Sequence, residues 1–229
     1  MTDIEPRLAT ALAAQFERWR ASLRDGAQRV GWKLGVGDRE RIGDEIAIGH
    51  LTSATVVSPG TVYRAHHDAD LHADAEVAVE LGRDLDPDAD FAAARRAIAG
   101  FGVALEIVDL SSPPDDPETV VAMNVFHRAV AFGRFRSTLP STDLQARLIV
   151  NGRVLDSAPV SSDWAERVCA AARLLGEMGE RLLAGDRIIT GSVVQVPVEE
   201  SDTVVADMAA LGEVQLSIAP PALPETRPV

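Results

Sequence analysis

The sequence predicts an α+β fold, mostly β, in which a mixed rolled sheet carries a few flanking helices. Short apolar and β-branched runs recur along the chain, many with period two, and they do not alternate regularly with helices as in a βαβ fold. The chain has 229 residues and 46% hydrophobic content, enough to bury one substantial core. We therefore expect a single domain over residues 1–219, with a packed N-terminal helix within residues 1–29, and a proline-rich tail over residues 220–229.

Composition restricts the class of partner. A formal net charge of −13 argues against nucleic acid and against an anionic membrane, because both require a basic surface. No apolar run approaches the ~20 residues of a membrane span, and the first residues lack the pattern of a signal peptide. With one cysteine, Cys169, no intrachain disulfide can form. We expect a cytoplasmic protein.

The first third of the chain should begin with a helix. Thr2 and Glu5 form a capping box, and apolar residues follow at helical spacing: Leu8, Leu12, Phe16, Trp19 and Leu23. A short strand is expected over residues 30–36 and an irregular stretch over residues 37–60. Residues 61–67 then lead towards the strand expected at residues 74–81.

Strands should dominate the remainder. We expect strands at residues 74–81, 101–110 and 129–133, a hairpin at residues 148–155 signalled by Asn151-Gly152, and late strands at residues 188–190, 193–198, 203–206 and 213–218. Residues 91–98 read as a short helix ended by Gly100, and residues 111–117 as a proline-rich loop. Asp163 should cap a second long helix, whose core face is Trp164, Val168, Ala171, Leu175, Met178 and Leu182.

The strand at residues 74–81 raises the question of function. With period two, Asp74, Glu76 and Glu80 share one face, and Ala75, Val77, Val79 and Leu81 share the other, as in a half-buried strand. Neighbouring carboxylates repel one another unless water or a cation lies between them. The acidic face is therefore either a solvated edge strand, which the residues alone favour, or a site of oxygen ligands for a hard cation.

Two further residues carry charge into apolar surroundings. Glu106 interrupts an otherwise apolar strand, and a buried carboxylate must be paired, protonated or bound to metal. It either forms a salt bridge with Lys33 or an arginine, or joins Asp74 and Glu76 around one cation. Lys33 is the only lysine among 22 basic residues; it is either a chance survivor or a buried ammonium that needs an anionic partner.

Four of the five histidines lie in or before the acidic strand: His50, His66, His67 and His72. They form either a polar loop or a lid beside the site. Their spacing does not match that of metal ligands.

Several short segments follow one another along the chain: residues 31–35 (GWKLG), 74–78 (DAEVA) leading into 81–85 (LGRDL), 104–108 (ALEIV), Asn124, Gly133 and 188–191 (IITG). In order and spacing they resemble the fumarylacetoacetate hydrolase superfamily, and within it the branch of 2-keto-4-pentenoate hydratase and 4-oxalocrotonate decarboxylase. The resemblance covers roughly residues 30 to 218. It implies a compact β-roll, a homo-oligomer, and Mg²⁺ or Mn²⁺ held by Asp74, Glu76 and Glu106, with Lys33 beside the substrate.

The resemblance also implies a chemistry. A 2-oxo acid can chelate a hard cation through its carboxylate and keto oxygens, and the cation and Lys33 then stabilise an enolate. The chain departs from the branch in three places: Asp74 replaces a glutamate, Arg64 and Ala65 stand where acidic residues are usual, and Phe126, His127 and Arg128 stand where small residues are usual.

We therefore expect a catalytic domain that acts as a metal-dependent lyase on a small 2-oxo acid. Hydration of a 2-hydroxydienoate or 2-oxoalkenoate is the first expectation; the alternatives are decarboxylation, acylpyruvate-type C–C hydrolysis, and a catalytically silent, metal-binding oligomeric partner. Hydrolysis needs a base such as His66, His67 or His127.

The expected catalytic residues are Lys33 and His127, and the expected substrate-binding residues are Arg64, His66, Arg128 and Asn124. Arg64 and Arg128 either read a second carboxylate of the substrate or pair with surface acids.

Overall fold

The computed structural model describes residues 6–35, 47–111, 117–138 and 143–221. Its helices are α1 (Pro6–Arg24), α3 (Phe91–Ala97), α4 (Pro117–Ala122) and α5 (Trp164–Glu177), with a 3-10 turn, η1, at Ala209–Leu211. Its strands are β1 (Arg29–Gly35), β2 (Ala47–Thr52), β3 (Val62–Arg64), β4 (Leu71–Leu81), β5 (Ile98–Asp109), β6 (His127–Phe132), β7 (Gln145–Val150), β8 (Arg153–Pro159), β9 (Arg187–Ile189), β10 (Val194–Pro197), β11 (Thr203–Asp207) and β12 (Glu213–Ala219).

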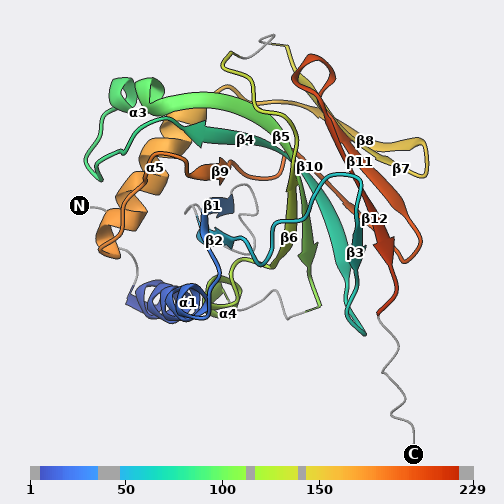
Figure 1. Cartoon of the computed structure of the whole chain (residues 1–229), viewed down its shortest axis with the longest axis horizontal. Coiled ribbons are helices and arrows are strands. Elements are labelled where there is room, and N and C mark those ends of the chain that lie inside the picture. Colours follow the sequence, from blue (N-terminus) through green and yellow to red (C-terminus); the bar gives the residue numbers. More distant parts are fainter. Residues whose placement is uncertain (1–5, 36–46, 112–116, 139–142, 222–229) are drawn as a thin grey trace, which may run out of the picture.

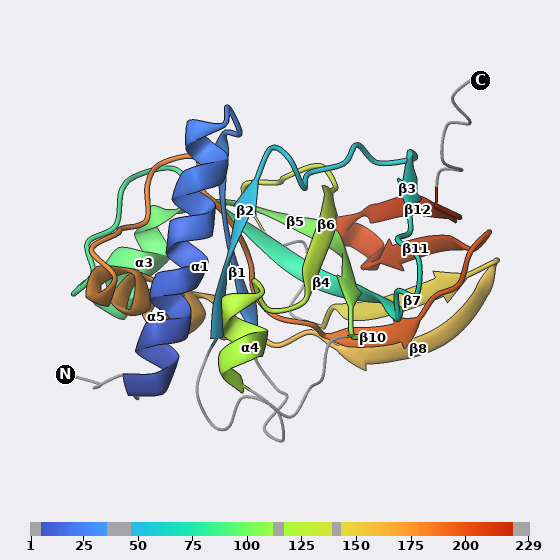
Figure 2. The ribbon, with the colours of Figure 1, turned by 90° about the horizontal axis from the view of Figure 1, so that it is seen from below.

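The strands form two sheets. The larger has the order β2-β1-β9-β4-β5-β6, with β10 also paired to β4, and the smaller has the order β3-β12-β11-β7-β8. Parallel and antiparallel pairs both occur, since β1 and β9 are parallel and β4 and β5 antiparallel. The long strands β4 and β5 curve across the molecule, with the helices on one side and the smaller sheet on the other (Figures 1 and 2). The expected class, α+β and mostly β with a mixed rolled sheet, is confirmed.

Helix α1 packs on the start of the large sheet through aromatic side chains. Phe16 stacks on Trp32 of β1 with ring centroids 5.6 Å apart, and Trp19 lies 5.1 Å from the same ring. Arg29 lies over both tryptophans and pairs with Asp186. The predicted apolar face of this helix is confirmed where its residues are described, and the capping box at Thr2 and Glu5 lies outside the described residues.

Strand β4 is buried on both faces, which corrects the expected half-buried strand. Ala73, Ala75 and Val77 pack against the smaller sheet, whereas Asp74 and Glu76 point the opposite way and are also buried. The interpretation as a solvated edge strand is therefore wrong, because β4 lies between β5 on one side and β9 and β10 on the other. Two sheets and a layer of helices leave this strand no solvent-facing side.

Other boundaries differ from the expectations. The stretch expected to be irregular contains strand β2, and a helix, α4, follows the proline-rich loop. Gly100 does not end a helix, since α3 ends at Ala97 and β5 begins at Ile98. Asp163 occupies the N-cap position of α5 without a side-chain cap bond. This helix ends at Glu177, so Leu182 lies outside it and forms a bridge with Leu85.

The Asn-Gly hairpin is confirmed. Asn151 and Gly152 have φ angles of 50° and 77°, the left-handed pair that a two-residue turn between β7 and β8 requires. None of the helices in the described part of the chain combines the length and hydropathy that crossing a lipid bilayer demands.

Candidate metal centre

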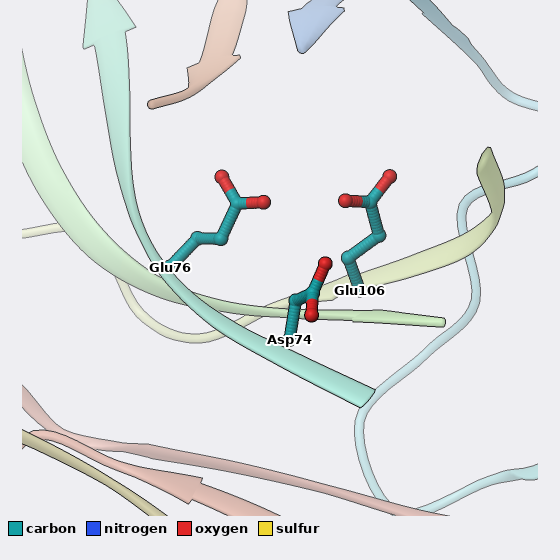
Figure 3. A group of neighbouring side chains, drawn as sticks. All are labelled: Asp74, Glu76 and Glu106. Carbon is teal, nitrogen blue, oxygen red and sulfur yellow. The ribbon is translucent and has the colours of Figure 1, made fainter. Parts of the chain in front are cut away.

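Three carboxylates converge on one face of the β4–β5 pair (Figure 3). Asp74 stands directly opposite Glu106 in the antiparallel register, and Glu76 follows two residues later on the same face. One oxygen from each residue lies within 4.8 Å of the others. Their exposed fractions are only 4%, 1% and 0%. The period-two pattern puts Asp74 and Glu76 on one face, and the strand register adds Glu106, which is distant from them in sequence.

This arrangement is electrostatically unfavourable without a cation. Burial, and next the charge of Glu106, raise the pKa of Asp74 to about 7, and the same two causes raise the pKa of Glu76 well above its ordinary value. Asp74 Oδ1 and Glu106 Oε2 are buried, and neither has a hydrogen-bond partner within the described ranges. Buried oxygens without donors are expensive, and a cation would satisfy them.

The donor set fits a hard divalent cation. All three ligand atoms are carboxylate oxygens, the type that Mg²⁺, Mn²⁺ and Ca²⁺ prefer. Oxygens on opposite sides of one such ion lie roughly 4 to 5 Å apart, close to the observed spacing. The residues present therefore fit a metal of this class.

The two carboxylate oxygens of Glu106 have different surroundings. Lys33 Nζ and His127 Nδ1 each lie 2.6 Å from Oε1, whereas Oε2 has no hydrogen-bond donor among the described residues. Burial acts to raise the pKa of Glu106, but the neighbouring Lys33 and His127 outweigh it, so that this pKa lies below its ordinary value. The predicted pairing of Glu106 with Lys33 and its predicted place beside Asp74 and Glu76 are thus both present.

His127 is enclosed behind Glu106. Its side chain has no exposed surface, and Nε2 lies 2.9 Å from the Thr55 hydroxyl. Burial lowers the pKa of His127 despite the nearby carboxylate. The imidazole therefore contacts a candidate metal ligand and does not line the cavity described below.

A left-handed turn at residues 124–126 holds the Lys33 ammonium near the carboxylates. Asn124, Val125 and Phe126 have successive φ angles of 63°, 52° and 64°, an unfavourable run for residues with side chains. The Asn124 amide compensates by donating to His50 O at 3.0 Å and accepting from His50 N at 2.7 Å. Lys33 Nζ donates to Val125 O at 2.9 Å. The turn thereby fixes the ammonium beside Glu106.

A cavity of about 420 Å³ opens in front of the carboxylates. Its polar lining includes Lys33, Ser192, Gln195 and Asp156. Much of the remaining wall is apolar: Leu34, Val108, Leu110, Val120, Val125, Phe126, Val193 and Val194. A small anionic molecule can therefore meet one ammonium and one cation site at the polar end and an apolar wall beyond them.

The structure brings together some of the predicted site residues and separates others. Lys33, Asp74, Glu76 and Glu106 line the cavity, and His127 contacts Glu106 from behind. Asn124 directly precedes the lining residue Val125 in the chain, and its side chain hydrogen-bonds to His50. Arg64 and His66 are exposed and lie outside the lining. Their substrate-binding role stays a prediction.

Arg128 also lies outside the lining, for a local reason. The register of β5 and β6 shifts between Ile107 and Val108, which leaves Arg128 unpaired in a bulge. Its guanidinium pairs with Asp109 at 3.1 Å. The sequence left two alternatives for Arg128: binding a second carboxylate of the substrate, or pairing with an acidic residue of the protein. The structure shows the second.

Sequence reasoning missed three polar lining residues. Ser192 and Gln195 follow the Thr190-Gly191 motif, and their hydrogen bonds act to lower the pKa of Asp74. Asp156 reaches the cavity from β8 of the smaller sheet. The position of Ser192 directly after a recognised motif was the available signal; nothing in the sequence indicated Asp156.

Comparison with known proteins identifies the family. Residues 36–219 match the family model described as fumarylacetoacetate (FAA) hydrolase, C-terminal. The chain belongs to the fumarylacetoacetate hydrolase family. A curated 4-oxalocrotonate decarboxylase from Pseudomonas sp is 28% identical over 198 residues, covering 79% of this chain and 75% of the relative. The expected resemblance is confirmed.

Solved structures share the fold, and some of them contain a divalent metal ion. The 4-oxalocrotonate decarboxylase from Pseudomonas putida G7, complexed with magnesium and adipate, is 25% identical with a TM-score of 0.84 over 92% of this chain and 86% of that chain. The same enzyme has also been solved with calcium and acetate. The fumarylpyruvate hydrolase from Pseudomonas aeruginosa, in complex with Mn²⁺ and pyruvate, shares the fold at 17% identity and a TM-score of 0.63, over 84% of this chain and 90% of that chain.

Proposed function

We propose that this protein is a metal-dependent enzyme that decarboxylates a small unsaturated 2-oxo acid, with Mg²⁺ or Mn²⁺ held by Asp74, Glu76 and Glu106. The observation that carries the proposal is the convergence of three buried carboxylates and Lys33 at one end of a cavity with an apolar wall. The similarity to 4-oxalocrotonate decarboxylase supports it. When bound, the metal supplies a Lewis-acid charge that favours negative charge on the keto oxygen of a 2-oxo acid.

Lys33 has two roles in this proposal. Its ammonium holds Glu106 Oε1, which leaves Oε2 turned towards the metal ligands. It also lines the cavity, so that a bound anion gains a fixed positive charge in surroundings of low polarity. As CO2 leaves, the electron pair of the broken C–C bond moves through the conjugated system to the keto oxygen. A fixed ammonium favours that shift of charge.

The apolar wall favours loss of CO2 over addition of water. Val108, Leu110, Val120, Val125 and Phe126 give a carboxylate at the far end of the substrate little solvation, whereas the departing CO2 is neutral. Hydrolysis requires a base to activate water. None of the histidines considered for that task lines the cavity as far as the described residues define it. The apolar wall therefore supports decarboxylation over hydration, and the lack of a lining histidine among the described residues supports it over C–C hydrolysis.

Product analysis tests the proposal. With Mg²⁺ or Mn²⁺, the enzyme should release CO2 from 4-oxalocrotonate, an unsaturated 2-oxo dicarboxylic acid, and EDTA should abolish the release reversibly. Hydration of 2-hydroxypentadienoate and C–C cleavage of acylpyruvates are measured in parallel. Hydration without CO2 release would restore the hydratase alternative, and metal binding without turnover of any substrate would favour the silent metal-binding partner.

A further inference from the structure

A single peptide group connects helix α5 to the candidate metal ligand Glu76. The N–H of Gly191 donates to Glu76 Oε2 at 2.7 Å. The carbonyl of the same amide, Thr190 O, accepts a hydrogen bond from Arg167 Nη1. A guanidinium and a carboxylate thus bind opposite ends of one amide dipole.

Arg167 and the amide itself are both held in place by further hydrogen bonds. Arg167 Nε donates to Asp163 Oδ1 at 2.9 Å, and Asp163 also accepts from the Ser161 hydroxyl. Thr190 is tied to β4, since its backbone N–H and its hydroxyl both donate to Val77 O, at 3.1 and 3.0 Å. The amide therefore has little freedom to turn away from Glu76, whose neighbour in the chain is Val77.

Arg167 itself stands outside the site. It is absent from the residues that line the cavity in front of the carboxylates, and it borders a separate cavity of about 200 Å³ together with Thr190 and Trp164. Its side chain is 20% exposed, so that water screens its charge only in part. Hydrogen bonds connect Arg167 to the carboxylate of Glu76 through the Thr190–Gly191 amide.

We propose that Arg167 is a positioning residue, which polarises the Thr190–Gly191 amide so that Gly191 N–H holds Glu76 in the orientation that completes the metal site. Hydrogen bonds in a chain strengthen one another, and a charged donor at the carbonyl end makes the amide N–H a better donor. Partners that orient carboxylate ligands commonly change metal affinity by about 10- to 100-fold. The inference rests on the proposed metal site but reaches a residue that touches neither metal nor substrate.

The first test needs no metal. In the metal-free protein, the amide proton of Gly191 should resonate downfield in the NMR spectrum and move upfield in Arg167→Met. Arg167→Lys, which restores the charge, should recover part of the shift. Arg173→Met is the matched control, because it removes the same charge from an exposed position on the same helix. Equal movement of the Gly191 proton in Arg167→Met and Arg173→Met would overturn the proposal.

The second test measures Mn²⁺ affinity by calorimetry. Arg167→Met should weaken Mn²⁺ binding by about 10-fold, Arg167→Lys by less, and Arg173→Met not at all. If Arg167→Met does not fold, Arg167→Gln takes its place, since it keeps a neutral donor without the charge. An unchanged Mn²⁺ affinity in a folded Arg167 variant would refute the positioning role.

A reference variant separates the two proposals. Wild-type protein that binds Mn²⁺, with binding lost in Glu106→Gln, establishes the metal site independently of Arg167. Wild-type protein that does not bind Mn²⁺ would refute the proposed function. In that case the Gly191 shift still shows whether Arg167 polarises the amide.

Discussion

Glu106 can form a buried ion pair within the protein and at the same time act as a metal ligand. The sequence offered a salt bridge with Lys33 and a metal ligand as alternatives, but a carboxylate has two oxygens and the structure uses them separately. Lys33 and His127 bind one oxygen, and the other has no hydrogen-bond donor in the described part of the chain and is available to a metal ion. A buried ammonium and a metal site are therefore compatible within one cluster.

Replacement of Lys33 by methionine should separate turnover from metal binding. The variant loses a fixed positive charge beside the substrate, so kcat should fall by about 10²-fold or more, the order measured when one preorganised donor is removed. Mn²⁺ affinity should change far less than kcat, because His127 still binds Glu106 Oε1 and the loss of a neighbouring positive charge offsets the loss of the Lys33 contact. Steady-state kinetics and calorimetry on the same preparation provide the two measurements.

A different pattern would contradict this role. Loss of Mn²⁺ binding together with turnover would mean that Lys33 only holds Glu106 in place. Unchanged kcat would remove the ammonium from the chemistry.

At the scale of elements, the sequence predicted most strands but not the bulge or the strand around Gly49. Strand β2 lacks a clear period-two pattern because Gly49 and His50 interrupt it. A Cβ at Gly49 would lie 2.7 Å from Lys33 Cγ and 2.8 Å from Asn124 Oδ1, so this glycine reflects a close approach across strands. Neither this approach nor the bulge at Arg128 has a signature in a single sequence. Arg128, which lies in this bulge, pairs with Asp109 and is outside the cavity lining.

The second prediction concerns how much the left-handed turn at Asn124 contributes to the free energy of unfolding. Asn124→Ala loses two hydrogen bonds to His50 and forces alanine to a φ of 63°, and should reduce the free energy of unfolding by about 3 kcal/mol. Asn124→Gly loses the same bonds without the backbone penalty, and should cost about 1 kcal/mol less. Urea denaturation of both variants measures the difference.

The same pair of variants examines the expected substrate contact of Asn124. A fall in kcat/KM without loss of stability would support that contact. A loss of stability in the order predicted supports the anchoring of the turn that holds Lys33.

At the scale of the molecule, the family and the rolled sheet could be predicted because short segments spread along most of the chain resemble those of the family in order and spacing. The family model matches residues 36–219. The three carboxylates were found by period two in one strand and by a charge in an apolar strand. Asp156 could not be found in this way, because it reaches the cavity from the other sheet, and only the packing of the two sheets decides which side chains meet there.

Metal removal gives the third prediction. A ligand that binds only the folded state at 100 times its Kd stabilises that state by about 2.7 kcal/mol. Mn²⁺ should therefore raise the Tm of the wild type by roughly 5–10 °C, and EDTA should reverse the change. Differential scanning calorimetry should show little or no rise in Glu106→Gln, whose ligand charge is lost. A rise of equal size in that variant would place the binding elsewhere.

The pairing of Asp74 with Glu106 also determines when, during folding, a metal can bind. A slip of one residue between β4 and β5 would turn the acids of one strand to the opposite face, so the ligands converge only after the long ladder has closed in its native register. A cation that binds only this register should slow unfolding, and it should leave the refolding rate unchanged when the register closes after the folding transition state. For this protein, a supply of divalent metal would act as protection against unfolding, and hence against proteolysis, rather than as an aid to folding.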